Sequence, residues 1–121
     1  LQAPAYFLHG DLTSALADRS TDLLISNPPY IPLTDAPTLA PEVREQEPHL
    51  ALFAGPDGLD AYRRLIADAS RVLAPGGRLM LELDHRAAPA VAAMLDARFD
   101  DRHILPDLAG HPRVFSTRFI G

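Results

Sequence analysis

The chain has 121 residues, which is enough for one domain of ordinary size and too few for two. Its apolar share of 47% and charged share of 22% are typical of a soluble globular protein and exclude a disordered tail or a coiled coil. Lysine is absent, which excludes Schiff-base and P-loop lysine chemistry, and the net charge of −5 disfavours non-specific binding of nucleic acid. Cysteine is also absent, which excludes disulfides and thiolate metal sites.

The first half of the chain predicts two strands and a long connection. A short apolar run predicts a strand at Ala5–Leu8, which ends in a turn. The continuous apolar run at Asp22–Ser26 predicts a strand buried on both faces, as in a parallel sheet. From Ile31 to Pro56 no periodicity is visible and prolines recur, which is typical of a functional or disordered connection.

The second half predicts two amphipathic helices and three strands. Apolar residues three and four apart predict a helix that begins near Asp57, its N-cap, and ends at Pro75–Gly77. The further elements expected are a strand at Arg78–Leu83, a helix at Ala87–Ala97, and strands at His103–Leu105 and Arg113–Phe119. Strands and helices in this order predict an α/β fold, with helices covering a sheet.

The tetrapeptide Asn27-Pro28-Pro29-Tyr30 directly follows the strand predicted at Asp22–Ser26. Ligands of open α/β sheets bind beyond the carboxyl ends of the strands, so a site is expected here. The two prolines fix their φ angles and lack N–H groups, which leaves the Asn27 side-chain oxygen and the Pro28 carbonyl as a stiff pair of acceptors, here called the amide ledge. The ledge suits an NH₂ group conjugated to a carbonyl or an aromatic ring. The alternative is a proline-rich turn with Asn27 as a cap.

The tetrapeptide and the motifs around it resemble the PrmC/HemK family. The residues that carry the resemblance are Ser26–Pro32, Glu42-Val43-Arg44, Glu47-Pro48, Ala51-Leu52, Gly55, Asp57-Gly58-Leu59, Tyr62-Arg63, Pro75-Gly76-Gly77 and Leu81-Glu82. The resemblance implies a class I (Rossmann-like) S-adenosylmethionine-dependent methyltransferase fold with a C-terminal antiparallel hairpin. It also implies transfer of a methyl group to the side-chain amide nitrogen of a glutamine in a peptide chain release factor.

The resemblance further implies roles for individual residues. Four would bind the substrate amide, the first two of them as the catalytic pair: Asn27, Pro28, Pro29 and Tyr30. Three would contact S-adenosylmethionine: Asp11, Leu12 and Asn27. Asp11 would accept from the adenine amino group and Leu12 would pack on the ring, whereas the residues alone favour a turn or helix cap at Asp11.

The chain also departs from the family. It contains no G-x-G, so the glycine-rich cofactor loop has no counterpart, and neither has the helical N-terminal domain. We therefore expect residues 1–121 to be the C-terminal portion of a catalytic domain that is truncated on its N-terminal side and inactive alone. The strand at Asp22–Ser26 would then expose an unpaired edge. Asp84-His85 stands where the family tends to carry glycine and glutamines, and the roles of Glu47, Glu82 and His85 stay open.

Two other function classes stay open. An amino-methyltransferase that acts on adenine or guanine of DNA or RNA would use the same ledge for a flipped base, although the negative charge argues against it. A non-catalytic fragment would have its sheet completed by a partner chain or a second copy. The five histidines lack metal-ligand spacing and no apolar run approaches the roughly 18 residues of a membrane span, so we expect no metal, no membrane and a cytoplasmic location.

Overall fold

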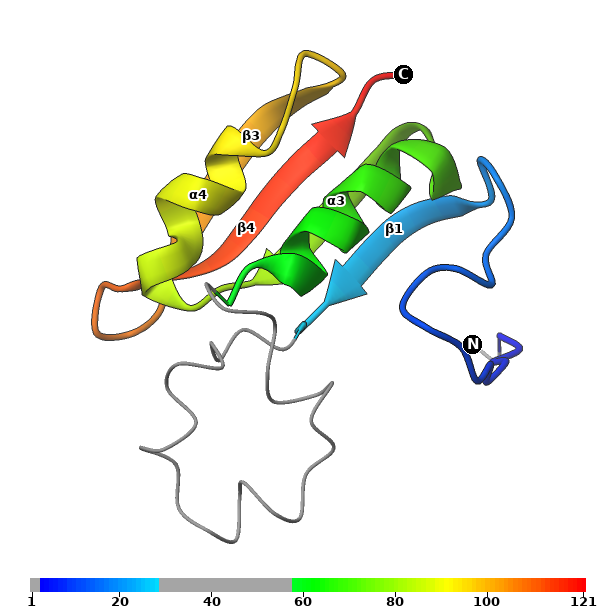
Figure 1. The fold of residues 1–121 in the computed structure, drawn as a ribbon, viewed down its shortest axis with the longest axis horizontal. Helices are drawn as coiled ribbons and strands as arrows, with labels where there is room; N and C mark the ends of the chain where they lie inside the picture. The colour runs from blue at the N-terminus through cyan, green and yellow to red at the C-terminus, as the bar shows by residue number, and fades with distance from the viewer. Residues whose placement is uncertain (1–2, 29–57) are drawn as a thin grey trace, which may run out of the picture.

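The computed structural model describes residues 3–28 and 58–121. The elements in chain order are β1 (Thr21–Ser26), α3 (Asp60–Val72), β2 (Leu73–Glu82), the 3-10 turn η2 (His85–Ala87), α4 (Ala88–Ala93), β3 (Phe99–Pro106) and β4 (Pro112–Phe119). The strands form one sheet in the order β1-β2-β4-β3 (Figure 1). β1 pairs with β2 in parallel and the other neighbours are antiparallel, so the sheet is mixed and the α/β class is confirmed.

Both helices lie against the same face of the sheet (Figure 1). α3 buries side chains that are three and four residues apart, which form one stripe on a helix: Ala61, Tyr62, Leu65, Ile66, Ala69 and Val72. All of these except Ala61 pack in a single core with Leu79 and Leu81 of β2, Val91 of α4 and two phenylalanines of β4, Phe115 and Phe119. The predicted amphipathic helix is therefore confirmed, and its apolar stripe seats it on the centre of the sheet.

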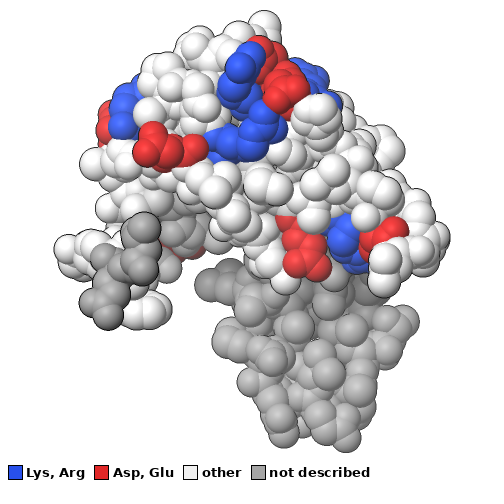
Figure 2. Space-filling view, turned by 180° about the vertical axis from the view of Figure 1, so that it is seen from behind, with Lys and Arg blue, Asp and Glu red and all other residues white. Residues whose placement is uncertain are grey.

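In the described part of the chain, no helix covers the opposite face of the sheet. Figure 2 shows this face, where charged side chains gather in separate groups with uncharged surface between them. Leu23 and Ile25 of β1 are 51% and 66% exposed, whereas Leu24 between them is buried in the core. Burial of this strand on both faces, as predicted, is therefore wrong for the described structure. β1 is also an edge strand there, with β2 as its one described neighbour.

The strand predicted at Ala5–Leu8 is wrong. Residues 3–9 have no regular secondary structure, and Tyr6, Phe7 and Leu8 are all more than 70% exposed. A strand needs a neighbour for its backbone N–H and C=O groups, and no described strand lies beside this segment. An apolar run is therefore not sufficient for a strand in this segment.

The junction between α3 and β2 differs from the prediction. Leu73 already pairs with Thr21, so β2 begins there rather than at Arg78, and the ladder resumes at Leu23 and Arg78 after an irregularity. The helix therefore ends at Val72, before the Pro75–Gly77 segment that was predicted to stop it, and that segment lies within β2. At the other end of α3, Leu59 occupies the N-cap position without a side-chain cap bond, and Asp57 lies outside the described residues.

The C-terminal elements also shift in their limits. α4 ends at Ala93 rather than Ala97 and follows η2, whose N-cap Asp84 accepts from the backbone N–H of Arg86. β3 begins at Phe99 rather than His103, because Phe99 pairs with Phe119 and their rings lie 5.4 Å apart. Of the helices that the structure describes, none has the length and apolar character needed to cross a membrane.

Candidate functional site

The amide ledge lies at the carboxyl end of β1. Ser26, the last residue of β1, is level with Leu81 of β2, so the ledge lies alongside the end of β2. Asn27 is exposed and Pro28 is buried. The asparagine amide is therefore open to a ligand, while the ring that follows it is packed against the protein. Two residues expected at the substrate site, Pro29 and Tyr30, lie outside the described residues, as does Glu47, whose role was left open.

The end of β2 beside the ledge is held from two directions. The hydroxyl of Tyr62, a fully buried residue of α3, donates a 2.8 Å hydrogen bond to the backbone carbonyl of Glu82. On the other side, the backbone N–H of Leu83 donates to the carbonyl of Arg113 at 2.7 Å, and the Arg113 side chain donates back to the Leu83 carbonyl at 3.3 Å. The strand end next to the ledge is thus fixed by both a helix and a neighbouring strand.

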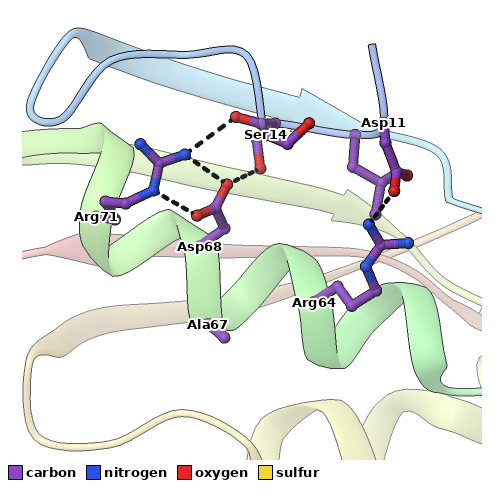
Figure 3. Close-up of a pocket in the computed structure, with 8 residues that line it drawn as sticks. Asp11, Ser14, Arg64, Ala67, Asp68 and Arg71 are labelled. Atoms are coloured by element: carbon purple, nitrogen blue, oxygen red, sulfur yellow. Dashed lines mark hydrogen bonds and ion pairs between the residues drawn. The ribbon is translucent and has the colours of Figure 1, made fainter.

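Asp11 and Leu12 both line a cavity of about 580 Å³. Figure 3 shows Asp11 facing Arg64 of α3 across it. The remaining lining residues come from the following turn and from α3: Thr13, Ser14, Arg64, Ala67, Asp68 and Arg71. Asp11 Oδ2 accepts from Arg64 Nη2 at 2.5 Å. The Asp11 carbonyl also accepts from the N–H of Ser14, and Leu12 has a φ of 53°, so the turn that the residues alone favoured is confirmed.

Arg71 and Asp68 hold one wall of this cavity. Arg71 donates to both oxygens of Asp68 (Figure 3). It also donates to the backbone carbonyls of Thr13 and Leu16, and the Thr13 hydroxyl donates to Asp68. The hydrogen bonds from Arg71 hold the pKa of the Asp68 carboxyl below its usual value against the opposing effect of burial. The turn that carries Asp11 and Leu12 is therefore tied to α3 by charge-assisted bonds.

The chemistry of this cavity fits an adenine ring in two respects. A carboxylate has about four acceptor positions, so Asp11 retains acceptor capacity for an amino group beside its bond to Arg64. Leu12 is 39% exposed and offers an apolar surface next to that carboxylate. Neither Asn27 nor Pro28 is among the described residues that line the cavity, so the predicted adenine side and the amide ledge are separate here.

A second hollow of about 310 Å³ at the end of β2 was not predicted. It is lined by Asp84, His85, Arg86 and Arg113, and the ring of His85 lies 5.0 Å from that of His111. The sequence marked Asp84-His85 only as a departure from the family, and nothing in the spacing of His85 and His111 indicates that they meet. In the part of the chain that the structure describes, no three metal-ligating side chains are grouped.

Comparison with known proteins shows which enzymes this chain is similar to. No family model matches the chain. Release factor glutamine methyltransferases of Deinococcus radiodurans, Caulobacter vibrioides and Cereibacter sphaeroides are 46%, 47% and 49% identical to it over 115, 115 and 109 residues. These matches cover 95%, 94% and 89% of the chain. The chain is homologous to one part of the release factor glutamine methyltransferases.

The relatives are considerably longer than the matched region. The chain spans about two fifths of each of them, 41%, 40% and 39% of their lengths in the same order. The resemblance inferred from the motifs is confirmed, and a four-stranded mixed sheet with helices on one face fits part of a class I methyltransferase fold. Because the relatives are named for glutamine in a release factor, the alternative of a methyltransferase acting on nucleic-acid bases is not favoured.

Proposed function

We propose that this chain supplies the glutamine-binding part of a methyltransferase that methylates the side-chain amide of a glutamine in a peptide chain release factor. The observation that carries the proposal is Asn27, exposed at the carboxyl end of β1 in a chain 46% identical to an enzyme of that name. Asn27 is the chain's one asparagine. Its neighbour Pro28 is buried, which supports a rigid ledge.

The ledge would bind the substrate amide through two acceptors. The Asn27 side-chain oxygen and the Pro28 carbonyl would each accept one N–H of the glutamine NH₂ group. An amide nitrogen is a poor nucleophile because its lone pair is delocalised, so holding both N–H groups directs the nitrogen and favours a pyramidal geometry. Pro29 and Tyr30 would shape the slot, and no covalent link between enzyme and substrate is required.

The methyl donor in this proposal is S-adenosylmethionine, which would supply an electrophilic methyl group when bound. Asp11 and Leu12 would hold its adenine, with the carboxylate as acceptor and the leucine as an apolar surface beside the ring. The cavity that these two residues line supports this assignment. Asn27 would lie near the reacting end of the donor, as the resemblance implies.

The chain would act as the C-terminal portion of a catalytic domain in a cytoplasmic protein. Its match to about two fifths of each relative supports a partial domain, as does the edge position of β1 in the described sheet. The further residues of such a domain would provide the glycine-rich cofactor loop and pair with β1. We expect the 121 residues alone to be inactive.

A chimera tests the proposal directly. This chain replaces the matching 115-residue segment of the Deinococcus radiodurans relative, and methyl transfer from labelled S-adenosylmethionine to a release factor is measured. The chimera should methylate glutamine, and Asn27→Ala should abolish transfer while donor binding, measured by calorimetry, persists. Ser20→Ala, just before the opposite end of β1, is the control and should retain activity.

Three outcomes would contradict the proposal. Full activity of Asn27→Ala would remove the ledge from the mechanism. Methyl transfer to duplex DNA or RNA, with none to the release factor, would support base methylation instead. Normal donor binding without transfer to any of these substrates would favour a non-catalytic fragment completed by a partner chain.

A further inference from the structure

The Glu82 carbonyl lies at the end of the ladder between β1 and β2, where β1 offers it no backbone N–H. Ser26 is level with Leu81, so Asn27 is level with Glu82. Backbone groups of successive strand residues point to opposite sides, and the N–H of Leu83 donates to β4, so the Glu82 carbonyl points toward β1. Its partner there would be the residue just beyond Asn27, because the hydrogen bonds of a parallel ladder are slanted.

That residue is Pro28, which has no N–H to donate. Glu82 is half-buried, and a partly buried carbonyl without a donor is destabilising, so a donor from elsewhere stabilises this strand end. The hydroxyl of Tyr62 supplies it, at 2.8 Å from the Glu82 oxygen. Tyr62 itself is fully buried on α3, so its ring is held firmly by the core.

We infer that Tyr62 is a positioning residue for the amide ledge. Its hydroxyl donates to the Glu82 carbonyl in place of the backbone N–H that Pro28 lacks. Proline at position 28 fixes the φ angle of the ledge, and the same proline leaves the ladder beside it without a backbone donor. Tyr62 closes that break by joining α3 to the end of β2, which keeps the ledge in register. This role rests on the proposed function for its catalytic consequence, but its structural basis is independent of that function.

A double-mutant cycle on the stability of the 121-residue chain tests whether the Tyr62 hydroxyl replaces the missing donor. Tyr62→Phe removes only the hydroxyl, and urea titration should show the folding equilibrium constant falling by about tenfold, as for one buried hydrogen bond. In a Pro28→Ala background, an N–H is restored at position 28. There the same Tyr62→Phe change should cost about threefold or less. Equal losses in the two backgrounds would overturn the inference.

Activity in the chimera tests the positioning role. Tyr62→Phe should lower kcat about tenfold and leave the KM for S-adenosylmethionine within about twofold, since misplacement of a reacting group lowers the rate of the chemical step. The matched control is Thr117→Val. The hydroxyl of Thr117 is also fully buried and donates to a backbone carbonyl, that of Asp100, at 2.7 Å. Thr117→Val should reduce stability and leave kcat unchanged.

The outcomes separate this inference from the proposed function. If Asn27→Ala abolishes activity and Tyr62→Phe leaves kcat unchanged, the positioning role is wrong and the proposed function stands. If both Tyr62→Phe and Thr117→Val lower kcat equally, the effect of Tyr62 is structural only and the inference fails. If Asn27→Ala is fully active, the proposed function fails, and the stability cycle still decides whether Tyr62 replaces the missing donor.

Discussion

Arg71 and Asp68, one turn apart on α3, are joined by two hydrogen bonds: Nε to Oδ1 at 2.7 Å and Nη2 to Oδ2 at 3.0 Å. The same guanidinium donates to the carbonyl of Leu16 at 2.7 Å, and Asp68 accepts from the hydroxyl of Thr13. A pair within one helix thus holds a turn more than 50 residues earlier in the chain. That turn carries Asp11, one of the predicted cofactor residues.

Removal of the Asp68 charge should loosen this turn. Asp68→Asn keeps the shape of the side chain but weakens its bonds to Arg71 and Thr13, so the free energy of unfolding at pH 7 should fall by about 1–3 kcal/mol. Urea denaturation measures the change. Asp18→Asn is the control, because Asp18 is 73% exposed and makes one bond to Arg71, so its loss should be much smaller. An equal loss would contradict the account.

The stabilising effect of Asp68 should depend on pH. The hydrogen bonds from Arg71 lower the pKa of Asp68 in the folded state. Its contribution is therefore present above the unfolded value of about 3.9 and is lost as the pH falls through the lower folded value. The stability difference between the native chain and Asp68→Asn should be constant from about pH 5 to 7 and should shrink below about pH 4. A difference that widens in acid would be inconsistent with this sign.

Two local motifs of the same geometry differ in burial. Asp84 accepts from the backbone N–H of Arg86 at 2.9 Å and from its guanidinium at 2.6 Å, and Asp96 makes the corresponding bonds to Arg98 at 2.9 and 2.7 Å. The Asp84 side chain is 11% exposed and that of Asp96 is 53% exposed.

Asp84→Asn should therefore lower the free energy of unfolding by about 1–3 kcal/mol, because the buried side chain at position 84 loses its charge-assisted bonds to Arg86. Asp96→Asn should have a clearly smaller effect, since water replaces the lost bonds, even though Arg98 lowers the pKa of Asp96 to about 2. Thermal and urea denaturation of both variants compare them. If the two losses are alike, burial is not the deciding factor.

Gly77 lies where β2 passes very close to other backbone atoms. A Cβ added there would lie 2.8 Å from the carbonyl oxygen of Ala74 and 3.1 Å from that of Thr21. Because both are backbone atoms in or beside the sheet, Gly77→Ala should lower the free energy of unfolding by about 1–3 kcal/mol. Gly10→Ala is the control, with its nearest atom 3.4 Å away, and should change stability by less than about 0.5 kcal/mol. Similar effects at both sites would contradict the close approach.

The edge of β1 should promote self-association of the isolated chain. Unpaired edge strands pair with other chains, and Ile25 on this edge strand is 66% exposed. Sedimentation should show association that increases with concentration and that Ile25→Lys reduces. Leu108→Lys alters an equally apolar, fully exposed residue of the β3–β4 connection and should have little effect. The prediction fails if Leu108→Lys reduces self-association and Ile25→Lys does not.

The pattern of apolar residues along the chain was sufficient to predict one helix and one strand of the described structure. The helix at Asp60–Val72 shows its apolar stripe in sequence, and the strand at Thr21–Ser26 shows a continuous apolar run. The position of Asn27 and Pro28 at a strand end followed from the same pattern. Ala5–Leu8 has equally apolar residues and forms no strand, because a strand also requires a neighbour.

The sequence by itself determined the α/β class, the place of Asn27 and Pro28 at a strand end and the resemblance to release factor glutamine methyltransferases. The tertiary structure alone decided which residues contact the segments that carry the predicted site. It joined Asp68 and Arg71 to the turn at Thr13, and it directed the Tyr62 hydroxyl to the Glu82 carbonyl beside Pro28. The physical reason is that periodicity records which face of an element is buried, whereas the partner of a polar group depends on packing between segments far apart in the chain.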